Sequence, residues 1–290
     1  MTCYFIVYNV KLGQCIGVLP HDQREYAMMV DCGHDGEFHP IDDFGRHLTK
    51  TSGPSSRPSL RSLVLTNYDH DHFSGLTYLH NAAKIESVLL AKNMSMQEVR
   101  AQKEESTDAL DTLEEIRTTY TADVTDYTPP FTRKVFSLQQ TDLVRAGIPI
   151  ETNHLSQMVF VKYGETTVCI PGDLEEPSWG LILAQQGVQT WLKQTDIFIA
   201  SHHGRSNGYH EEIFKYCKPA CVIMSDKAIV HGTQEDMTTL YANKVRGSGI
   251  RFSPATGSAA MRKVLTTRSD GHILVTAPKV GPASFEAYSA

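Results

Sequence analysis

The sequence predicts an α/β protein built as one large domain. Short apolar runs rich in β-branched residues, typical of strands, alternate with segments typical of helices along most of the chain. The 290 residues are enough for one large domain or two small ones, but no internal repeat and no linker divides them. The composition, 41% hydrophobic and 21% charged, is ordinary for a globular protein.

In the first half of the chain, strands are expected where an apolar run is bounded by turn-forming residues. The expected strands are residues 4–10, 15–19, 26–30, 60–66 and 85–90, and the expected helices are 42–50 and 76–83. Charged residues and helix formers then dominate, so residues 92–130 are interpreted as a helical insertion. The insertion is either a lid or a solvated excursion, and we slightly favour the second.

The second half repeats the alternation of strand and helix. The expected strands are residues 134–138, 158–163, 167–170, 196–200 and 220–225, followed by closing strands that end near residue 275, and the expected helices are 179–186, 211–216 and 234–245. The residues after Pro278 are small and polar, which predicts a loose tail.

The most informative stretch directly follows the strand at 60–66. Residues 67–72 read Asn-Tyr-Asp-His-Asp-His, and Asn67, Asp69, Asp71 and His72 each offer an oxygen or a nitrogen to a cation. Carboxylates and imidazoles this close repel each other unless a positive charge lies among them. A divalent metal is therefore favoured over the alternative, a polar turn in which an Asp caps a helix.

Two later strand ends carry the same kinds of residue. Asp173 follows the strand at 167–170, and His202 and His203 follow the strand at 196–200. Because loops at one edge of a sheet commonly carry the active residues, we expect these side chains to converge. A divalent cation held there would activate water to hydrolyse a phosphodiester, an ester or an amide without an organic cofactor. Asp31, at the end of the strand at 26–30, is interpreted as a supporting residue rather than a ligand.

The order of these residues resembles a known family. Residues 66–75 resemble the His-x-His-x-Asp-His signature of the metallo-β-lactamase fold, and more narrowly the His-x-Asp-x-Asp-His form of the ComEC-type domain of DNA-uptake competence proteins. Further segments similar to that branch follow in the same order, at residues 10–14, 30–33, 153–156, 172–173, 201–204 and 231–232. The resemblance implies a four-layer αββα sandwich spanning residues 1–290 as a single domain.

The resemblance also implies ligand positions. Asp71, His72 and Asp173 would be metal ligands together with one of His202 and His203. His202 directly follows the strand, so it is preferred as the ligand, and a catalytic or substrate-binding role is assigned to His203.

Three further positions complete the implied site. Asp69 would serve the other metal position, and Asp71 is expected to be essential for catalysis. His231 would contact the substrate as a general acid or a phosphate contact, and the alternative of a loop histidine without a role is weighted equally.

The sequence departs from the family pattern at one metal position. Asn67 stands where the family has its first histidine, and an amide oxygen is a poorer zinc ligand than an imidazole. The usual middle histidine is also missing, unless His154 takes its place. We therefore expect one or two divalent ions, Zn²⁺ or Mn²⁺: either one tight ion with a labile second, or a preference for the harder Mn²⁺.

The expected activity is hydrolysis of phosphodiester bonds by a nuclease acting on DNA or RNA, a specificity that rests on the resemblance. Such an enzyme needs restraint in a cell, so a regulatory protein partner is expected, for example in phage defence. A small-molecule phosphodiesterase, acting on a cyclic nucleotide or a phosphocholine ester, and a binding or scaffold protein with a degenerate metal site are the alternatives. A polymer substrate would need a basic cleft, for which Arg205, Lys227 and Arg251 are the candidates.

Composition excludes some other classes. The net charge of −6 gives no global basic field, which argues against a protein that coats nucleic acid. The six cysteines are scattered and are expected to be free thiols in a reducing compartment. The first residues have no signal-peptide pattern and no apolar run is long enough to span a bilayer, so a cytoplasmic protein without a membrane partner is expected.

Overall fold

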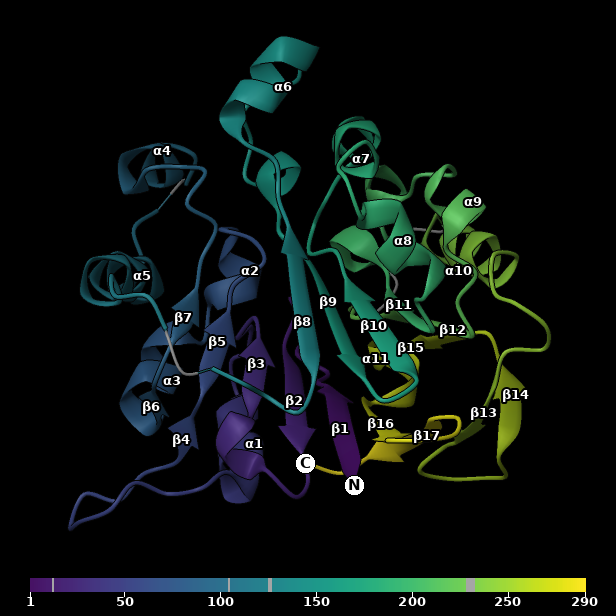
Figure 1. The fold of residues 1–290 in the computed structure, drawn as a ribbon, viewed down its shortest axis with the longest axis horizontal. Helices are drawn as coiled ribbons and strands as arrows, with labels where there is room; N and C mark the ends of the chain where they lie inside the picture. Colours follow the sequence, from purple (N-terminus) through teal and green to yellow (C-terminus); the bar gives the residue numbers. More distant parts are fainter. Residues whose placement is uncertain (12, 104, 125–126, 228–232) are drawn as a thin grey trace.

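Two β-sheets stacked face to face form the centre of the protein, with helices outside each sheet (Figure 1). The computed structural model describes residues 1–11, 13–103, 105–124, 127–227 and 233–290. The larger sheet has nine strands in the order β14-β13-β17-β16-β1-β2-β3-β5-β7, and the smaller has six in the order β15-β12-β11-β10-β9-β8. The predicted αββα architecture is confirmed.

Most of the expected strands are present. The nine-stranded sheet contains β1 (Thr2–Val7), β2 (Ile16–Pro20), β3 (Met28–Val30), β5 (Ser62–Val64), β7 (Val88–Leu89), β13 (Ile250–Ser253), β14 (Ala260–Arg262), β16 (His272–Pro278) and β17 (Ser284–Tyr288). The six-stranded sheet contains β8 (Thr132–Phe136), β9 (Met158–Tyr163), β10 (Thr166–Ile170), β11 (Ile197–Ile199), β12 (Cys221–Met224) and β15 (Val264–Thr266). A separate two-stranded ribbon pairs β4 (Ser59–Leu60) with β6 (Lys84–Ile85).

The helices are short, and most of them cover the outer faces of the sheets (Figure 1). They are α1 (Pro40–His47), α2 (His70–Phe73), α3 (Leu76–Ala82), α4 (Met96–Ala101), α5 (Asp108–Thr119), α6 (Gln140–Ala146), α7 (Glu176–Leu183), α8 (Val188–Lys193), α9 (Ile213–Tyr216), α10 (Thr233–Ala242) and α11 (Thr267–Asp270). In Figure 1 the helices α1 to α5 lie on the side of β5 and β7, and α7 to α10 lie beside the strands of the smaller sheet.

Alternation along each strand divides the core into layers. On β9, Val159 and Val161 face the core between the two sheets, whereas Met158 and Phe160 belong to the core beneath the helices. The same division holds on β11, where Ile197 and Ile199 flank Phe198. Neighbouring side chains on a strand point to opposite faces, so a strand covered on both sides is apolar at every position.

The insertion is packed against the domain. Helix α5 begins at the cap Thr107 and buries Leu110, Leu113 and Ile116 in the core beneath the helices. It contacts α3 and α2, and α2 carries two of the expected ligands. The preference for a solvated excursion is therefore wrong for α5. Every third or fourth residue of that helix is apolar, and these residues are buried against the domain.

The chain after Pro278 is ordered, which corrects the expectation of a loose tail. Strand β17 pairs with β16 on one side and with β13 on the other. Phe285 is 4% exposed and lies in the core between the sheets. The two neighbouring strands provide hydrogen-bond partners for the backbone N–H and C=O groups of this segment. Its small, polar composition does not reveal this pairing.

Phe285→Ala is expected to lower the free energy of unfolding by about 3–5 kcal/mol, because it leaves a cavity in the core between the sheets. Urea denaturation followed by circular dichroism measures the difference. The neighbouring Glu286 is exposed, so Glu286→Ala is a matched control that should change stability by less than about 0.5 kcal/mol. Equal stability of the two variants would show that this strand is not docked in solution.

All six cysteines are buried and free, as the sequence predicts. In the part of the chain that the structure describes, no helix combines the length and apolarity needed to cross a bilayer.

Candidate metal centre

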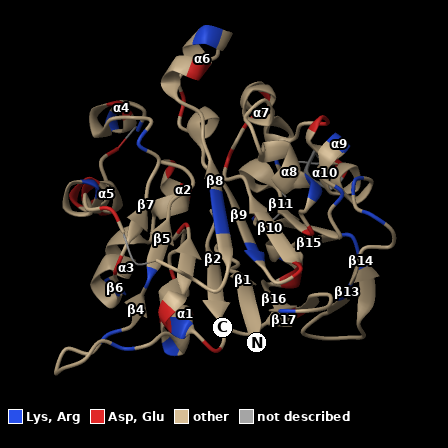
Figure 2. Cartoon of the chain, in the orientation of Figure 1, with Lys and Arg blue, Asp and Glu red and all other residues tan. Residues whose placement is uncertain are grey.

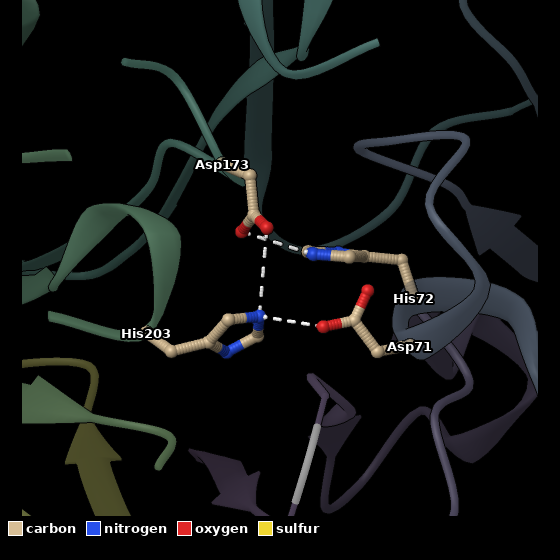
Figure 3. A group of neighbouring side chains, drawn as sticks. All are labelled: Asp71, His72, Asp173 and His203. Atoms are coloured by element: carbon tan, nitrogen blue, oxygen red, sulfur yellow. Dashed lines mark ion pairs between the residues drawn. The ribbon is translucent and has the colours of Figure 1, made fainter. Parts of the chain in front are cut away.

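Four side chains from three separate segments meet at one point, at the ends of β5, β10 and β11 (Figure 3). Asp71 and His72 come from α2, Asp173 follows β10, and His203 follows β11. One ligand atom from each of these residues lies within 4.8 Å of the other three. The predicted convergence of the strand ends is therefore present.

Local backbone conformation delivers these side chains to the centre. Gly172 has φ +59°, and a Cβ atom there would lie 2.8 Å from Thr66 Oγ1, so only glycine fits before Asp173. After β11, His202 and His203 both adopt left-handed conformations, with φ of 49° and 56°. Non-glycine residues rarely occupy this region, and such strain is concentrated at functional sites.

The distances between the four side chains are short. His72 Nε2 lies 2.9 Å from Asp173 Oδ1, and His203 Nε2 lies 3.5 Å from Asp173 Oδ2 and 3.1 Å from Asp71 Oδ2. The side chains of His72, Asp173 and His203 are at most 6% exposed, whereas that of Asp71 is 29% exposed. The centre is therefore closed on three sides and open to solvent beside Asp71.

These residues fit a divalent cation. Within the described ranges, His72 Nε2, His203 Nε2 and Asp173 Oδ1 are buried without a hydrogen-bond partner, although they lie at ion-pair distance from one another. Buried polar atoms are almost always hydrogen-bonded, so three such atoms that face one point suit a shared partner. Two imidazole nitrogens and two carboxylates are a donor set that Zn²⁺ and Mn²⁺ accept.

A hydrogen bond from Nδ1 orients the ring of each of the two histidines. His72 Nδ1 donates to Asp31 Oδ2 at 2.8 Å, and His203 Nδ1 donates to the backbone oxygen of Ser225 at 2.9 Å. Asp31 is fully buried and also accepts from Thr66 and Gln14. This arrangement fixes each ring with Nε2 toward the centre and is typical of metal-binding histidines. Asp31 is the supporting residue that the sequence predicts.

Without a cation, protons balance the carboxylates. Burial opposes the charged form of His203, but Asp173 and Asp71 outweigh it and raise the pKa of His203 to about 10. The pKa of His72 is likewise raised well above its ordinary value, because Asp173 and Asp31 overcome the effect of burial. Burial would raise the pKa of Asp71, but His203 and His72 lower it to about 2. The pocket is thus built to hold positive charge.

A model of the metallo-beta-lactamase superfamily matches residues 22–216, well over half of the chain. The chain belongs to the metallo-β-lactamase superfamily. Among solved structures, unliganded yeast PDE1 is 14% identical with a TM-score of 0.50, and the match covers 96% of this chain and 99% of PDE1. YhfI from Bacillus subtilis is 12% identical with a TM-score of 0.48, covering 93% of this chain and 98% of YhfI. These likenesses concern the fold.

A diphosphatase of the PhnP family is also similar, at 10% identity and a TM-score of 0.43, with 90% of this chain and 83% of that chain covered. No curated protein matches the chain.

The second histidine of the pair, His202, lies beside the group of four. Its Nε2 is 2.9 Å from Arg205 Nη1 and its Nδ1 is 3.2 Å from Glu175 Oε1. The nearest Asp173 oxygen is 3.9 Å away. The geometry therefore favours His203 as the ligand in this member of the superfamily, in place of the expected His202. Both residues have left-handed backbone conformations, and the spacing in the sequence does not reveal which of the two rings faces the centre.

Asn67 and Asp69, expected at a further metal position, are engaged elsewhere. Asp69 Oδ1 accepts from Lys103 Nζ at 2.5 Å and from Thr152 Oγ1 at 2.6 Å. Asn67 Nδ2 donates to Asn153 Oδ1 at 2.6 Å. Neither residue belongs to the group of four. Lys103, which follows α4 in the insertion, supplies a fixed positive charge to Asp69, and no motif in the sequence marks it.

The remaining expected residues lie away from the group. His154 is buried and lies 3.9 Å from Glu151, not at the centre. Arg251 is on β13, which is separated from β5 by β17, β16, β1, β2 and β3, so it does not line a cleft at the metal centre. His231 lies outside the described residues.

Proposed function

We propose that this chain is a metal-dependent hydrolase of phosphodiester bonds, acting as a nuclease on DNA or RNA. The observation that carries the proposal is the convergence of ligand atoms from Asp71, His72, Asp173 and His203 on one point. In the part of the chain that the structure describes, the buried atoms His72 Nε2, Asp173 Oδ1 and His203 Nε2 have no hydrogen-bond partner there. These four residues would hold a Zn²⁺ or Mn²⁺ ion. When bound, the ion supplies a Lewis acid and makes a water molecule nucleophilic near neutral pH.

The residues beside the centre suit a phosphate group. Arg205 is exposed and carries a planar set of N–H donors that matches phosphate oxygens. Arg205 also contacts His202, which in turn lies between Asp173 and Glu175. A phosphodiester bound at Arg205 would therefore be separated from Asp173 by His202, which would be available to orient it.

The preference for a nucleic-acid substrate is supported by the resemblance of residues 67–72 to the ComEC-type motif, since a fold by itself does not determine function. A small phosphodiester is the second candidate, because the distant position of Arg251 leaves Arg205 and Lys227 as the candidate cations for the cleft. A nuclease of this kind would need a restraining protein partner, which remains part of the proposal.

A screen of metals against substrates tests the proposal. Purified protein loaded with Zn²⁺, Mn²⁺ or Mg²⁺ is incubated with single-stranded DNA, double-stranded DNA, RNA and bis-p-nitrophenyl phosphate. We expect cleavage of a nucleic acid that is lost in Asp71→Ala. Cleavage of bis-p-nitrophenyl phosphate alone would favour the small phosphodiester. Cleavage by Asp71→Ala at the parent rate would contradict the site, because the activity would then belong to a contaminant.

Metal binding is expected to release about two protons per ion near pH 7, because His203 and His72 carry protons in the metal-free centre and must lose them to act as ligands. Isothermal titration calorimetry in buffers of different ionisation enthalpy measures the number of protons. We expect one tight ion per chain, because Asp69 is neutralised by Lys103. A measured release of zero protons, or two equally tight ions, would contradict this arrangement.

The same pKa values predict how pH acts on the metal-free protein. The folded-state pKa of His203 is about 10, above its unfolded value, so its contribution to stability is complete below about pH 6.5. That contribution is lost as the pH rises through 10. Metal-loaded protein should keep its melting temperature over this range. Parallel thermal melts at pH 7 and pH 10 distinguish the two forms.

A further inference from the structure

A second cavity lies at the open edge of the sandwich, apart from the metal centre. Its volume is about 510 Å³, within the range of small-molecule sites. It is bordered by β7, the last strand of the larger sheet, by β8, the last strand of the smaller sheet, and by the C-terminal end of α5. Basic residues colour part of β8 in Figure 2. None of the four metal-centre residues lines this cavity.

Three cationic side chains line the cavity: Lys92, Arg117 and Arg133. Across the described ranges, none of them forms an ion pair with a carboxylate. Arg133 Nη1 donates to Ser62 Oγ at 3.0 Å. Two contacts are with rings: the Arg133 guanidinium lies 5.0 Å from the centre of the Tyr127 ring, and the Arg117 guanidinium lies 5.6 Å from that of Tyr68. Each arginine also contacts a methionine sulfur at 3.6 Å, Met28 for Arg133 and Met96 for Arg117.

The charge in this cavity differs from that of the whole protein. The chain carries 33 acidic residues against 27 basic ones, yet these cations gather without acidic partners. The described lining includes one carboxylate, Asp123. Burial also lowers the pKa of Arg133, which shows that its charged form loses solvation there. Arg133 is the desolvated cation of the three, whereas Lys92 is exposed and Arg117 is half-buried. A desolvated cation with two further positive charges around the same cavity favours an anion between them, so the cavity is complementary to a negatively charged ligand.

We propose that this cavity binds a nucleoside phosphate, either free or as one unit of a nucleic-acid strand. Lys92, Arg117 and Arg133 would contact the phosphate oxygens. The hydroxyl-bearing Ser87 and the ring of Tyr120 also line the cavity and offer a polar and a flat surface to the sugar and the base. The site is argued from its own residues and does not rest on the proposed hydrolase.

The cavity is one contact away from the segment that carries the metal ligands. Arg117 lies over the ring of Tyr68, which is buried and donates to the backbone oxygen of Ala91. Tyr68 stands between Asn67 and Asp69 in the motif at residues 67–72. A ligand held by Arg117 would therefore act on Tyr68 through the Arg117 side chain.

Binding to matched variants of the full metal-loaded chain tests the proposal, with thymidine 5′-monophosphate and a ten-nucleotide oligothymidylate as probes in calorimetric titrations. The double variant Lys92→Gln/Arg117→Gln removes two cations from the cavity and should weaken binding by about a hundredfold, roughly tenfold for each charged contact. The control is Lys134→Gln, which follows Arg133 on β8 but lies 5.5 Å from the Phe136 ring and does not line the cavity. This variant should bind like the parent.

Two further measurements distinguish binding in the cavity from binding at the metal centre and identify the ligand. Asp173→Asn should still bind the probes, because Asp173 does not line the cavity. Tighter binding of the oligothymidylate than of the monophosphate would identify a strand as the ligand, and equal affinities would identify a free nucleotide. The proposal is overturned if the folded double variant, checked by circular dichroism, binds both probes as tightly as Lys134→Gln. Absence of hydrolysis by the parent would count against the proposed function alone.

Discussion

Asp173→Asn is expected to abolish metal retention and hydrolysis while leaving the fold in place. Asp173 is the shared partner of His72 and His203, at 2.9 Å and 3.5 Å, and it is 2% exposed. An amide of the same size cannot balance a dication and removes an anionic ligand. Because loss of a supporting residue behind a ligand already costs about 10–100-fold in metal affinity, loss of Asp173 should cost at least about a hundredfold.

Elemental analysis after dialysis, together with the hydrolysis assay, measures this effect. Asp111→Asn is the matched control, since Asp111 is 64% exposed and pairs with Arg100 on α4, away from the centre. The control should retain the metal content and activity of the parent. If Asp173→Asn retained one ion per chain with unchanged affinity, the group of four would not be the metal site.

Asp31→Asn is expected to have the second largest effect, although Asp31 would not touch the ion. Its two oxygens accept four hydrogen bonds, from the Thr66 backbone nitrogen, Thr66 Oγ1, Gln14 Nε2 and His72 Nδ1, at 2.6–2.8 Å. A carboxylate can accept all four, but the NH₂ group of asparagine is a donor and would face other donors. His72 would lose its fixed orientation, so metal affinity should fall about 10–100-fold.

Stability should fall as well. Asp31 is fully buried, and truncation in Asp31→Ala leaves a buried histidine and a buried glutamine without their acceptor, which costs about 3–5 kcal/mol. Urea denaturation of the metal-free variants gives this value separately from metal affinity. The control is Asp42→Asn on α1, where Asp42 is exposed and accepts a hydrogen bond from Tyr78. An Asp31→Ala variant as stable as the control would show that this network is not formed in solution.

The elements of the fold were largely readable from the sequence, because buried strands in a two-sheet sandwich are apolar on both faces. Strands β9 and β10 begin and end within one residue of the expected bounds. The strand β17 was missed because its stability comes from β13 and β16, which pair with it on either side. The packing of α5 was misjudged for a related reason: its charged residues face solvent while its apolar positions meet α3.

The site was predictable in its residue types and only partly in its geometry. Asp71, His72 and Asp173 follow strand ends, and the order of motifs places strand ends at one edge of a sheet. His202 and His203 have left-handed backbone conformations, which two adjacent histidines in a sequence do not predict. The sequence therefore could not show which of them faces the centre. The loss of Asp69 from the centre depends on Lys103, which is distant in the sequence and belongs to the insertion.

Apolar patterning in the sequence by itself determined a single α/β domain and the kinds of atom that gather at the strand ends, and the resemblance of its short motifs to a known family implied the αββα sandwich, because patterning and short motifs are local properties. Tertiary structure alone decided which histidine faces the centre, which acidic residue a lysine neutralises, and where three cations meet between the edge strands. These outcomes depend on side chains from distant segments meeting in space, and their energies come from contacts that no local pattern encodes.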